Sequence, residues 1–315
     1  PRPLIVAIFW LCTPPPSLAH PTRARAVSTG TTVASLGKRT MDGERGFRHF
    51  GSNPNCLGLG KRVWPGPQVN RLRNQSPNQR LQAIARDLVA LSHNPDDFDH
   101  AFHLLNASYG TPAAAQARER LKSDPSIAPL VAERYWGPWP QTPDLVQLPP
   151  GSLGQSYGRF LESQGLEPLP DPELSEGTNA DDHYLQLRIR HTHDLWHVVA
   201  GIPPTSAGEA ALDGLTTEQL RWPGSALLLA AHLLHRAEAD PQKGPDVGLA
   251  IAFGLELGAK GQPLLAQRWE EGWSTPLQEW RQELGIDALM QRNPFCSTAR
   301  SIQGSDWGEI LLLPG

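Results

Sequence analysis

The stretch that decides the fold runs from residue 180 to residue 200 and reads ADDHYLQLRIRHTHDLWHVVA. On a helical wheel with about 100° per residue, Leu185, Ile189 and Trp196 cluster within about 40° of one another. The sequence GIPP at residues 201–204 is typical of a helix end, because glycine terminates helices and proline cannot continue them. The pattern therefore predicts a helix over residues 180–200 with one strongly apolar face.

The 3–4 spacing of apolar residues recurs along most of the chain, whereas convincing strand alternation and hairpin turns are absent. We therefore predict an all-α fold, a single bundle-like domain of many helices. The segment at residues 225–237 is apolar nearly all round and is expected to be a central helix. Residues 136–150 are rich in proline and are predicted to be a loop. Further helices are predicted near residues 77–91, 94–105, 112–122, 152–164, 206–221, 246–259 and 275–284, with another that Pro263 interrupts.

The two ends of the chain are rich in turn-forming residues and are predicted to be poorly ordered. Residues 1–41 lack acidic side chains and begin with an apolar run, residues 4–12, that is too short to span a bilayer. This pattern fits a signal peptide or an arginine-rich transit peptide. The interpretation that we favour is an upstream extension, with the working protein starting near Met41. We expect an extension or targeting segment at residues 1–75, a helical domain at 76–286 and an irregular tail at 287–315.

The bulk properties exclude several classes of protein. The formal net charge is −4 and no run of Lys or Arg exceeds two residues, so nucleic acid is not an expected partner. The three cysteines, at positions 12, 56 and 296, are scattered, which argues against a disulfide scaffold and a cysteine zinc site. The absence of P-loop and Gly-x-Gly-x-x-Gly motifs argues against a P-loop NTPase and a Rossmann dinucleotide enzyme.

The helix at residues 180–200 also carries the densest set of reactive side chains. His193 and His197 are one turn apart, so they share one face with Cβ atoms roughly 5–6 Å apart. Asp194 and Glu209, which follows His197 after eleven residues, add carboxylates of the kind found beside imidazoles at Zn²⁺ or Fe²⁺ sites. Two carboxylates and two neutral imidazoles would balance the charge of a divalent ion. These four residues are therefore our candidate metal ligands.

Each of these residues also has an interpretation without a metal. The histidines and Asp194 could form a buried hydrogen-bond network. The sequence SAGE at residues 206–209 matches a capping box, in which the Glu209 side chain reaches back to the amide of the N-cap residue. Asp194 points about 100° away from His193 on the helix, so it either binds the metal directly or orients a ligand. These alternatives stay open at the level of sequence.

A polar stripe extends from the two histidines along the predicted helix. Gln186 and Arg190 lie in the same sector of the wheel, beside the apolar face. Arg190 is either a surface residue or a partner for a substrate carboxylate.

Other histidines carry weaker signals. His100 and His103 lie close in sequence to three aspartates, which we interpret as partners of a helix dipole, with the histidines on the surface or in packing. His232 and His235 are interpreted as core packing, with the lining of a pocket as the alternative.

The spaced motif resembles the signature of a known family. His-Asp-x-x-His, eleven residues and then Glu are similar to the signature of the fourth coenzyme Q biosynthesis protein family, and here they stand as His193 to His197 and Glu209. The sequence GIP at residues 201–203, Gly208, and the upstream and downstream flanks at 153–161 and 269–280 are also similar. The resemblance covers roughly residues 75–286. The family's Pro-Asp-x-Arg stretch is not reproduced, since Pro-Glu follows the Pro-Asp at 170–171.

The resemblance implies an all-α protein that holds a divalent metal, usually zinc with iron or magnesium as alternatives, and binds a polyprenyl lipid. It implies removal of the C1 carboxyl from a polyprenylated 4-hydroxybenzoate during ubiquinone synthesis. The implied partners are other quinone-biosynthesis enzymes, the inner membrane through peripheral contact, and a second copy in a homodimer. The implied location is cytoplasmic, or organellar if residues 1–41 are a transit peptide. The implied metal ligands are His193, Asp194, His197 and Glu209.

Two rivals remain beside this decarboxylase interpretation. One is a non-catalytic prenyl-lipid-binding scaffold that organises other enzymes of the pathway. The other is a metal-dependent phosphohydrolase, for which His183 or Asp213 would have to serve as a further ligand. Small residues at 248, 250, 252, 254 and 258 either leave room for a prenyl chain or permit close helix packing.

Overall fold

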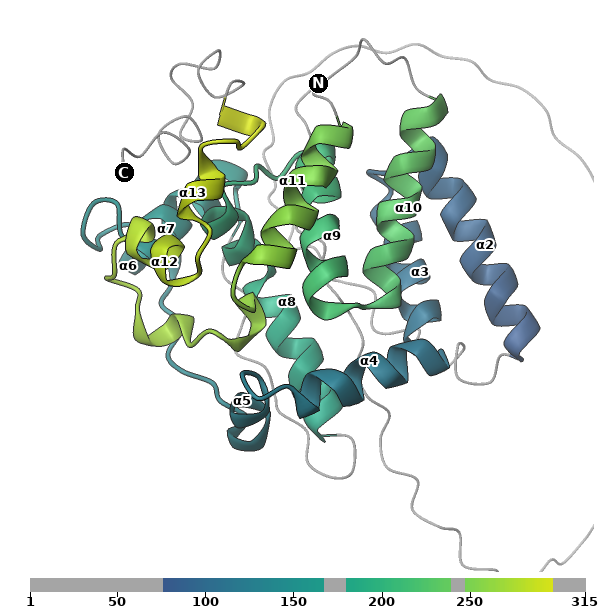
Figure 1. The fold of residues 1–315 in the computed structure, drawn as a ribbon, viewed down its shortest axis with the longest axis horizontal. Coiled ribbons are helices and arrows are strands. Elements are labelled where there is room, and N and C mark those ends of the chain that lie inside the picture. The colour runs from purple at the N-terminus through teal and green to yellow at the C-terminus, as the bar shows by residue number, and fades with distance from the viewer. Residues whose placement is uncertain (1–75, 167–179, 239–246, 297–315) are drawn as a thin grey trace, which may run out of the picture. The chain divides into compact units, whose positions relative to one another are not determined.

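The structure is a computed structural model that describes residues 76–166, 180–238 and 247–296. These residues are mostly helical and contain no strand, which confirms the all-α prediction (Figure 1). Every helix among them is too short or too polar to cross a bilayer. The predicted extension at residues 1–75 and the Pro-Asp at 170–171 lie outside the described residues.

Three helices open the described part of the chain, and each begins at a polar side chain that caps its first turn. The Ser76 hydroxyl accepts a hydrogen bond from the Gln79 amide at 3.3 Å, and the Gln79 side chain accepts one from the Ser76 amide at 2.8 Å. This reciprocal capping box fixes the start of the first helix. The side chains of Asp97 and Thr111 each accept one backbone hydrogen bond, and they cap the second and the third helix, respectively. The three helices are α2 (Pro77–His93), α3 (Phe98–Tyr109) and α4 (Pro112–Ser123).

Three further helices follow, two of them short, and one of the short helices lies inside the predicted loop at residues 136–150. There the prediction is wrong over one turn, because Thr142, Pro143 and their neighbours form a short helix. Proline is favoured in a first helical turn, where its missing N–H leaves no bond unmade. The helices are α5 (Ala128–Glu133), α6 (Thr142–Leu145) and α7 (Leu153–Gln164).

Four long helices form the second half of the fold. Among them, α9 and α11 pack along their length, and α10 packs against α9, α2 and α3 (Figure 1). Helix α8 contacts α4, α5, α7 and α12, so it has neighbours on several sides. The bounds are α8 (Ala180–Ala200), α9 (Ser206–Leu220), α10 (Pro223–Glu238) and α11 (Val247–Lys260).

The expectation that residues 225–237 form a central helix is wrong. Leu233 and Leu234 of α10 are 47% and 45% exposed, whereas Leu228 and His232 are buried. Helix α10 therefore buries one face against its neighbours. The central helix is α8, of which almost every residue is buried although its sequence is far more polar.

The chain after α11 does not continue as the predicted interrupted helix. Pro263 is followed by two 3₁₀ turns, and the Gln219 side chain of α9 accepts a hydrogen bond from the Leu264 amide at 3.0 Å. The same side chain donates to the Gln262 carbonyl at 3.0 Å. The Gln219 side chain thus gives these backbone groups the hydrogen bonds that a continued helix would have made internally. A short helix also lies in the segment where an irregular tail was expected. The elements are η1 (Leu264–Ala266), η2 (Trp269–Glu271), α12 (Leu277–Glu283) and α13 (Asp287–Met290).

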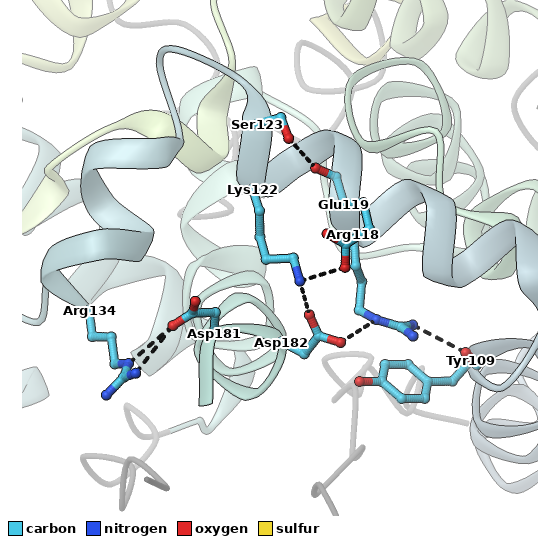
Figure 2. Close-up of polar contacts among 8 residues, drawn as sticks. All are labelled: Tyr109, Arg118, Glu119, Lys122, Ser123, Arg134, Asp181 and Asp182. Atoms are coloured by element: carbon cyan, nitrogen blue, oxygen red, sulfur yellow. Dashed lines mark hydrogen bonds and ion pairs between the residues drawn. The ribbon is translucent and has the colours of Figure 1, made fainter. Parts of the chain in front are cut away.

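Ion pairs fix the first turn of α8 against earlier parts of the chain (Figure 2). Asp182 pairs with Arg118 Nε and Lys122 Nζ of α4, each at 2.8 Å. Asp181 pairs with Arg134, directly after α5, at 3.3 Å. Carboxylates also suit the positive end of a helix dipole. These contacts set where α8 begins, and with it the position of the residues that follow.

Two glycines allow α9 and α11 to approach at backbone distance. A Cβ atom on Gly254 would lie 1.8 Å from the Ala211 carbonyl oxygen, and one on Gly258 would lie 2.7 Å from the Leu215 carbonyl oxygen. Real Cβ atoms do not come so close. At these two positions the small residues therefore serve close helix packing.

Replacing Gly254 by alanine is expected to lower the free energy of unfolding by about 1–3 kcal/mol, because the added methyl forces the two backbones apart. Chemical denaturation measures the change. The control is Ala252→Leu on the exposed side of the same helix, which should cost little. Equal stability of Gly254→Ala and the wild type would contradict the close approach.

Candidate metal centre

A tight turn joins α8 to α9 and brings Glu209 back toward the histidines. Gly201 has φ of +62°, a conformation that glycine adopts without strain, and the Ile202 amide donates to the His197 carbonyl at 2.9 Å. A Cβ atom on Gly208 would lie 1.7 Å from the Pro203 carbonyl oxygen, so the chain can close this tightly only with glycine there.

The cap of α9 decides between the two interpretations of Glu209. The N-cap residue is Thr205, whose hydroxyl accepts a hydrogen bond from the Gly208 amide at 3.2 Å. A capping box needs Glu at the third position after the N-cap residue, and from Thr205 this position is Gly208. The capping box predicted from Ser206 to Glu209 is therefore wrong. The Glu209 carboxylate instead faces the two histidines of α8.

Three side chains converge between α8 and α9. Glu209 Oε2 lies 3.7 Å from His193 Nε2, and Glu209 Oε1 lies 3.3 Å from His197 Nε2. The two imidazole rings are 5.1 Å apart and nearly perpendicular, at 82°. One ligand atom from each residue lies within 4.8 Å of the others, and all three residues are buried. The structure thus brings together three of the four predicted ligands.

The orientation of His197 is fixed by its second ring nitrogen. Nδ1 lies 3.0 Å from the Ile202 carbonyl oxygen, which can only accept, so Nδ1 carries a proton, and in the neutral ring Nε2 then presents its lone pair. Phe160 stacks on this ring at 6.1 Å. The Nε2 atoms of both His193 and His197 are buried, and no hydrogen bond from the described residues reaches them. Two buried imidazole nitrogens that converge on a carboxylate and receive no hydrogen bond in the described part of the chain fit the ligand set of a divalent cation.

The charges around this group favour a cation. Burial by itself would raise the pKa of Glu209, but the nearby His197 and His193 hold the pKa far below its ordinary value. Burial would likewise lower the pKa of His197, and the Glu209 carboxylate outweighs it, so the pKa is raised. Glu209 therefore keeps a buried negative charge, which either protonated imidazoles or a bound cation can balance.

Asp194 lies outside the set of three convergent ligand atoms. It is buried, and burial raises its pKa above the ordinary value even though His193 and His197 act in the opposite direction. Its charge also raises the pKa of the buried Tyr157 hydroxyl, an effect second to burial itself. The structure therefore places Asp194 next to the site, and its role as a ligand stays a prediction.

A second polar pair, which the sequence interpretation missed, lies one turn further along α9. Asp213 Oδ2 is 3.7 Å from His232 Nε2 of α10, and both residues are buried. Burial raises the pKa of Asp213 well above its ordinary value and lowers the pKa of His232 to about 4. His232 was interpreted as core packing, and only its partner on another helix reveals the pair.

His232 is expected to make the stability of the folded chain depend on pH. Between its unfolded pKa of 6.5 and its folded pKa of about 4, the unfolded chain binds a proton that the folded chain does not. The free energy of unfolding therefore rises with pH in this window, by up to about 1.4 kcal/mol per pH unit from this group. Asp213, Glu209 and His235 face the imidazole and modulate the slope.

Denaturation of the metal-free protein between pH 4 and pH 7 measures this slope. His232→Gln should reduce it by close to one proton, and His93→Gln, at an exposed site on α2, should leave it unchanged. An unaltered slope in His232→Gln would show that the imidazole titrates normally in the folded chain.

The remaining candidates do not join the site. His183 and Asp213 are buried, but neither belongs to the groups of described residues whose ligand atoms converge, which leaves the phosphohydrolase interpretation without its extra ligand. His100 and His103 do converge with Asp87, where His100 Nδ1 lies 3.0 Å from Asp87 Oδ1. Arg86 also pairs with Asp87, so ordinary ion pairing explains that cluster.

A serine motif at residues 154–158, GQSYG, has no catalytic setting. The Gly-x-Ser-x-Gly pattern of a nucleophile elbow requires a sharp turn between a strand and a helix. Here Ser156 lies buried inside α7. A Cβ on Gly154 would lie 2.9 Å from the Trp273 carbonyl oxygen, so this glycine serves helix packing.

Comparisons with known proteins indicate the family to which the chain is related. The family model described as coenzyme Q (ubiquinone) biosynthesis protein Coq4 matches residues 74–290. The ubiquinone biosynthesis protein COQ4 homolog, mitochondrial, of Danio rerio is 30% identical over 233 residues, which cover 71% of this chain and 80% of that protein. The homolog from Drosophila ananassae is 32% identical over 156 residues, covering 46% and 54%. A crystal structure of a protein from Nostoc punctiforme PCC 73102, described as a ubiquinone biosynthesis protein, matches with a TM-score of 0.57 and 27% identity, covering 67% of this chain and 98% of that one.

Proposed function

Because the chain belongs to the Coq4 family of ubiquinone biosynthesis proteins, we propose that it is a metal-dependent enzyme that removes the C1 carboxyl of a polyprenylated 4-hydroxybenzoate-type intermediate. The observation that carries this proposal is the convergence of His193, His197 and Glu209, with both Nε2 atoms buried beside the Glu209 carboxylate and without a hydrogen bond from the described residues. We propose these three residues as direct metal ligands, and Asp194, the remaining predicted ligand, as either a fourth ligand or a residue that orients one of the other three.

The proposed reaction breaks the bond between the ring carbon and the carboxyl group. Carbon dioxide leaves, the electron pair stays on the ring, and a proton takes the vacated position. A divalent metal, zinc in our proposal with iron or magnesium as alternatives, supplies a Lewis acid for an oxygen of the substrate. Asp213, a buried carboxyl one turn beyond Glu209 on α9 whose pKa burial raises well above its ordinary value, is the proposed proton donor.

Arg190 is the proposed partner of the substrate carboxylate. It is a partly buried residue one turn before His193 on α8, and burial lowers the pKa of its guanidinium. An arginine in such surroundings binds carboxylates strongly through its planar fork of N–H groups.

A polyprenylated substrate resides in a membrane, so we propose peripheral association with the inner membrane and contact with other enzymes of the pathway. The relatives from Danio rerio and Drosophila ananassae are described as mitochondrial, which favours an organellar location for this chain as well. A homodimer remains part of the proposal.

The second candidate function is a scaffold that binds prenyl lipid without catalysis. Three convergent ligands leave an open coordination position, as catalytic zinc sites do, and this favours an enzyme. Coordination by Asp194 as well would close the site and favour the scaffold.

One experiment separates these candidates. The purified full chain is analysed for metal and for organic-extractable lipid, and it is then supplied with a prenylated 4-hydroxybenzoate labelled in the carboxyl carbon. Release of labelled carbon dioxide with about one equivalent of metal supports the enzyme. Bound lipid and metal without turnover support the scaffold, and the lack of both lipid and metal contradicts the two proposals together. A phosphatase screen tests the phosphohydrolase separately.

A further inference from the structure

Gln186 of α8 is a buried amide whose polar atoms are unused. The residue is 3% exposed. Its Oε1 and Nε2 atoms are both buried, and neither has a hydrogen-bond partner in the described part of the chain. A glutamine side chain offers two N–H donors and one acceptor oxygen, and folded proteins rarely leave such groups unpaired in the interior. An amide that is unpaired at both ends indicates that a ligand supplies the missing partner.

The position of Gln186 connects this amide with the candidate metal centre. Residues 186, 190, 193 and 197 follow one another at intervals of four, three and four, so they share one face of α8. At about 100° per residue they fall within a sector of about 60°. His193 lies seven positions after Gln186, which corresponds to about 10 Å along the helix axis. The amide therefore lies at one end of a polar face and the convergent ligands lie at the other.

This face of α8 has a cationic end and a neutral end. The proposed metal position and the Arg190 guanidinium are cationic, so they suit the carboxylate of an aromatic acid. Gln186 is neutral and can both donate and accept, which suits a hydroxyl group, itself a donor and an acceptor. The spacing is comparable to the length of a benzene ring with oxygen substituents at opposite ends.

We propose that Gln186 binds the 4-hydroxyl of the aromatic head group and so selects hydroxybenzoates over benzoates. This inference rests on the proposed function, because it takes the prenylated aromatic acid as the ligand. Gln186 acts as a specificity residue, since it touches the substrate at the end opposite to the carboxyl group that leaves.

The test pairs one substitution with two ligands. Gln186→Met keeps the length of the side chain and removes its polar atoms, and removal of an unpaired buried amide should not weaken the fold. The ligands are a prenylated 4-hydroxybenzoate and the same compound without the 4-hydroxyl, each titrated into the zinc-loaded full chain. The wild type is expected to bind the hydroxylated ligand about tenfold more tightly, the value of one good hydrogen bond. Gln186→Met is expected to bind both ligands equally, at the affinity of the wild type for the deoxy compound.

Gln116 provides a matched control, because it is an exposed glutamine on another helix, α4. Gln116→Met makes the same chemical change away from the polar face of α8 and should keep the tenfold preference. A preference that survives in Gln186→Met would overturn the inference, as would an equal loss of affinity for both ligands. If the wild type binds neither compound, the proposed function itself fails and this inference fails with it.

Discussion

Replacing Glu209 by glutamine is expected to weaken divalent-metal binding by more than roughly a hundredfold while the helices stay folded. The loss of an outer-shell partner of a metal ligand already costs about ten- to a hundredfold, and Glu209 would be a direct ligand. It is also the anion among the three convergent side chains, so the glutamine variant leaves two neutral imidazoles to face a dication. Elemental analysis after gel filtration and zinc titration with a competing chelator measure the change.

The control for this variant is Glu218→Gln, at a partly buried position further along α9, which should still bind about one equivalent of metal. Helicity by circular dichroism shows whether both variants fold. Asp194→Asn adds a further comparison, because a direct ligand should lose as much affinity as Glu209 and an orienting residue should lose less. Wild-type zinc affinity in Glu209→Gln would contradict the site.

The sequence predicts the helices well because their signals are local. The apolar spacing and the terminal glycines and prolines lie within each segment, so α8 and α9 begin and end where their patterns indicate. The pair of histidines was likewise visible, since residues four apart on a helix must share a face.

The cap of α9 shows where local signals stop being sufficient. Thr205 and Ser206 are both good N-cap residues, and a choice between them shifts Glu209 by one position in the first turn. The close approach of Gly208 to the Pro203 carbonyl settles that choice, and this contact exists only in the folded turn. The position of the Glu209 carboxylate beside the two histidines therefore depends on a detail that its neighbours in sequence leave open.

Contacts between segments that are distant in sequence could not be predicted from the sequence patterns. Asp213 and His232 lie on different helices, and no pattern in the sequence around either residue predicts that they pair. Arg188 is a polar residue on a helix wheel, yet its side chain is 1% exposed, because its carboxylate partner lies 82 residues later. The pattern within one helix indicates which of its residues can be buried. The partners of its buried polar side chains come from other elements, which the pattern does not identify.

That buried ion pair is expected to give the largest loss of stability of any single substitution considered. Glu270 accepts from Arg188 through both carboxylate oxygens, one of them at 3.0 Å from Nη2, and the same Nη2 donates to the Gln267 carbonyl at 2.7 Å. Glu270→Ala leaves the guanidinium buried without its anion, which should cost about 3–5 kcal/mol of unfolding free energy in urea denaturation. The control is Glu271→Ala, since Glu271 is an exposed partner of Arg268 at 3.5 Å and should cost less than about 1 kcal/mol.

A second variant separates the desolvated charge from the lost packing. Arg188→Met combined with Glu270→Leu removes both charges and keeps most of the volume, so it should recover a large part of the stability lost in Glu270→Ala. Such recovery would assign the cost to an unpaired buried charge on α8, the helix that carries His193. If Glu270→Ala costs no more than Glu271→Ala, the guanidinium reaches water when its partner is removed, and α8 is less tightly enclosed than its burial indicates.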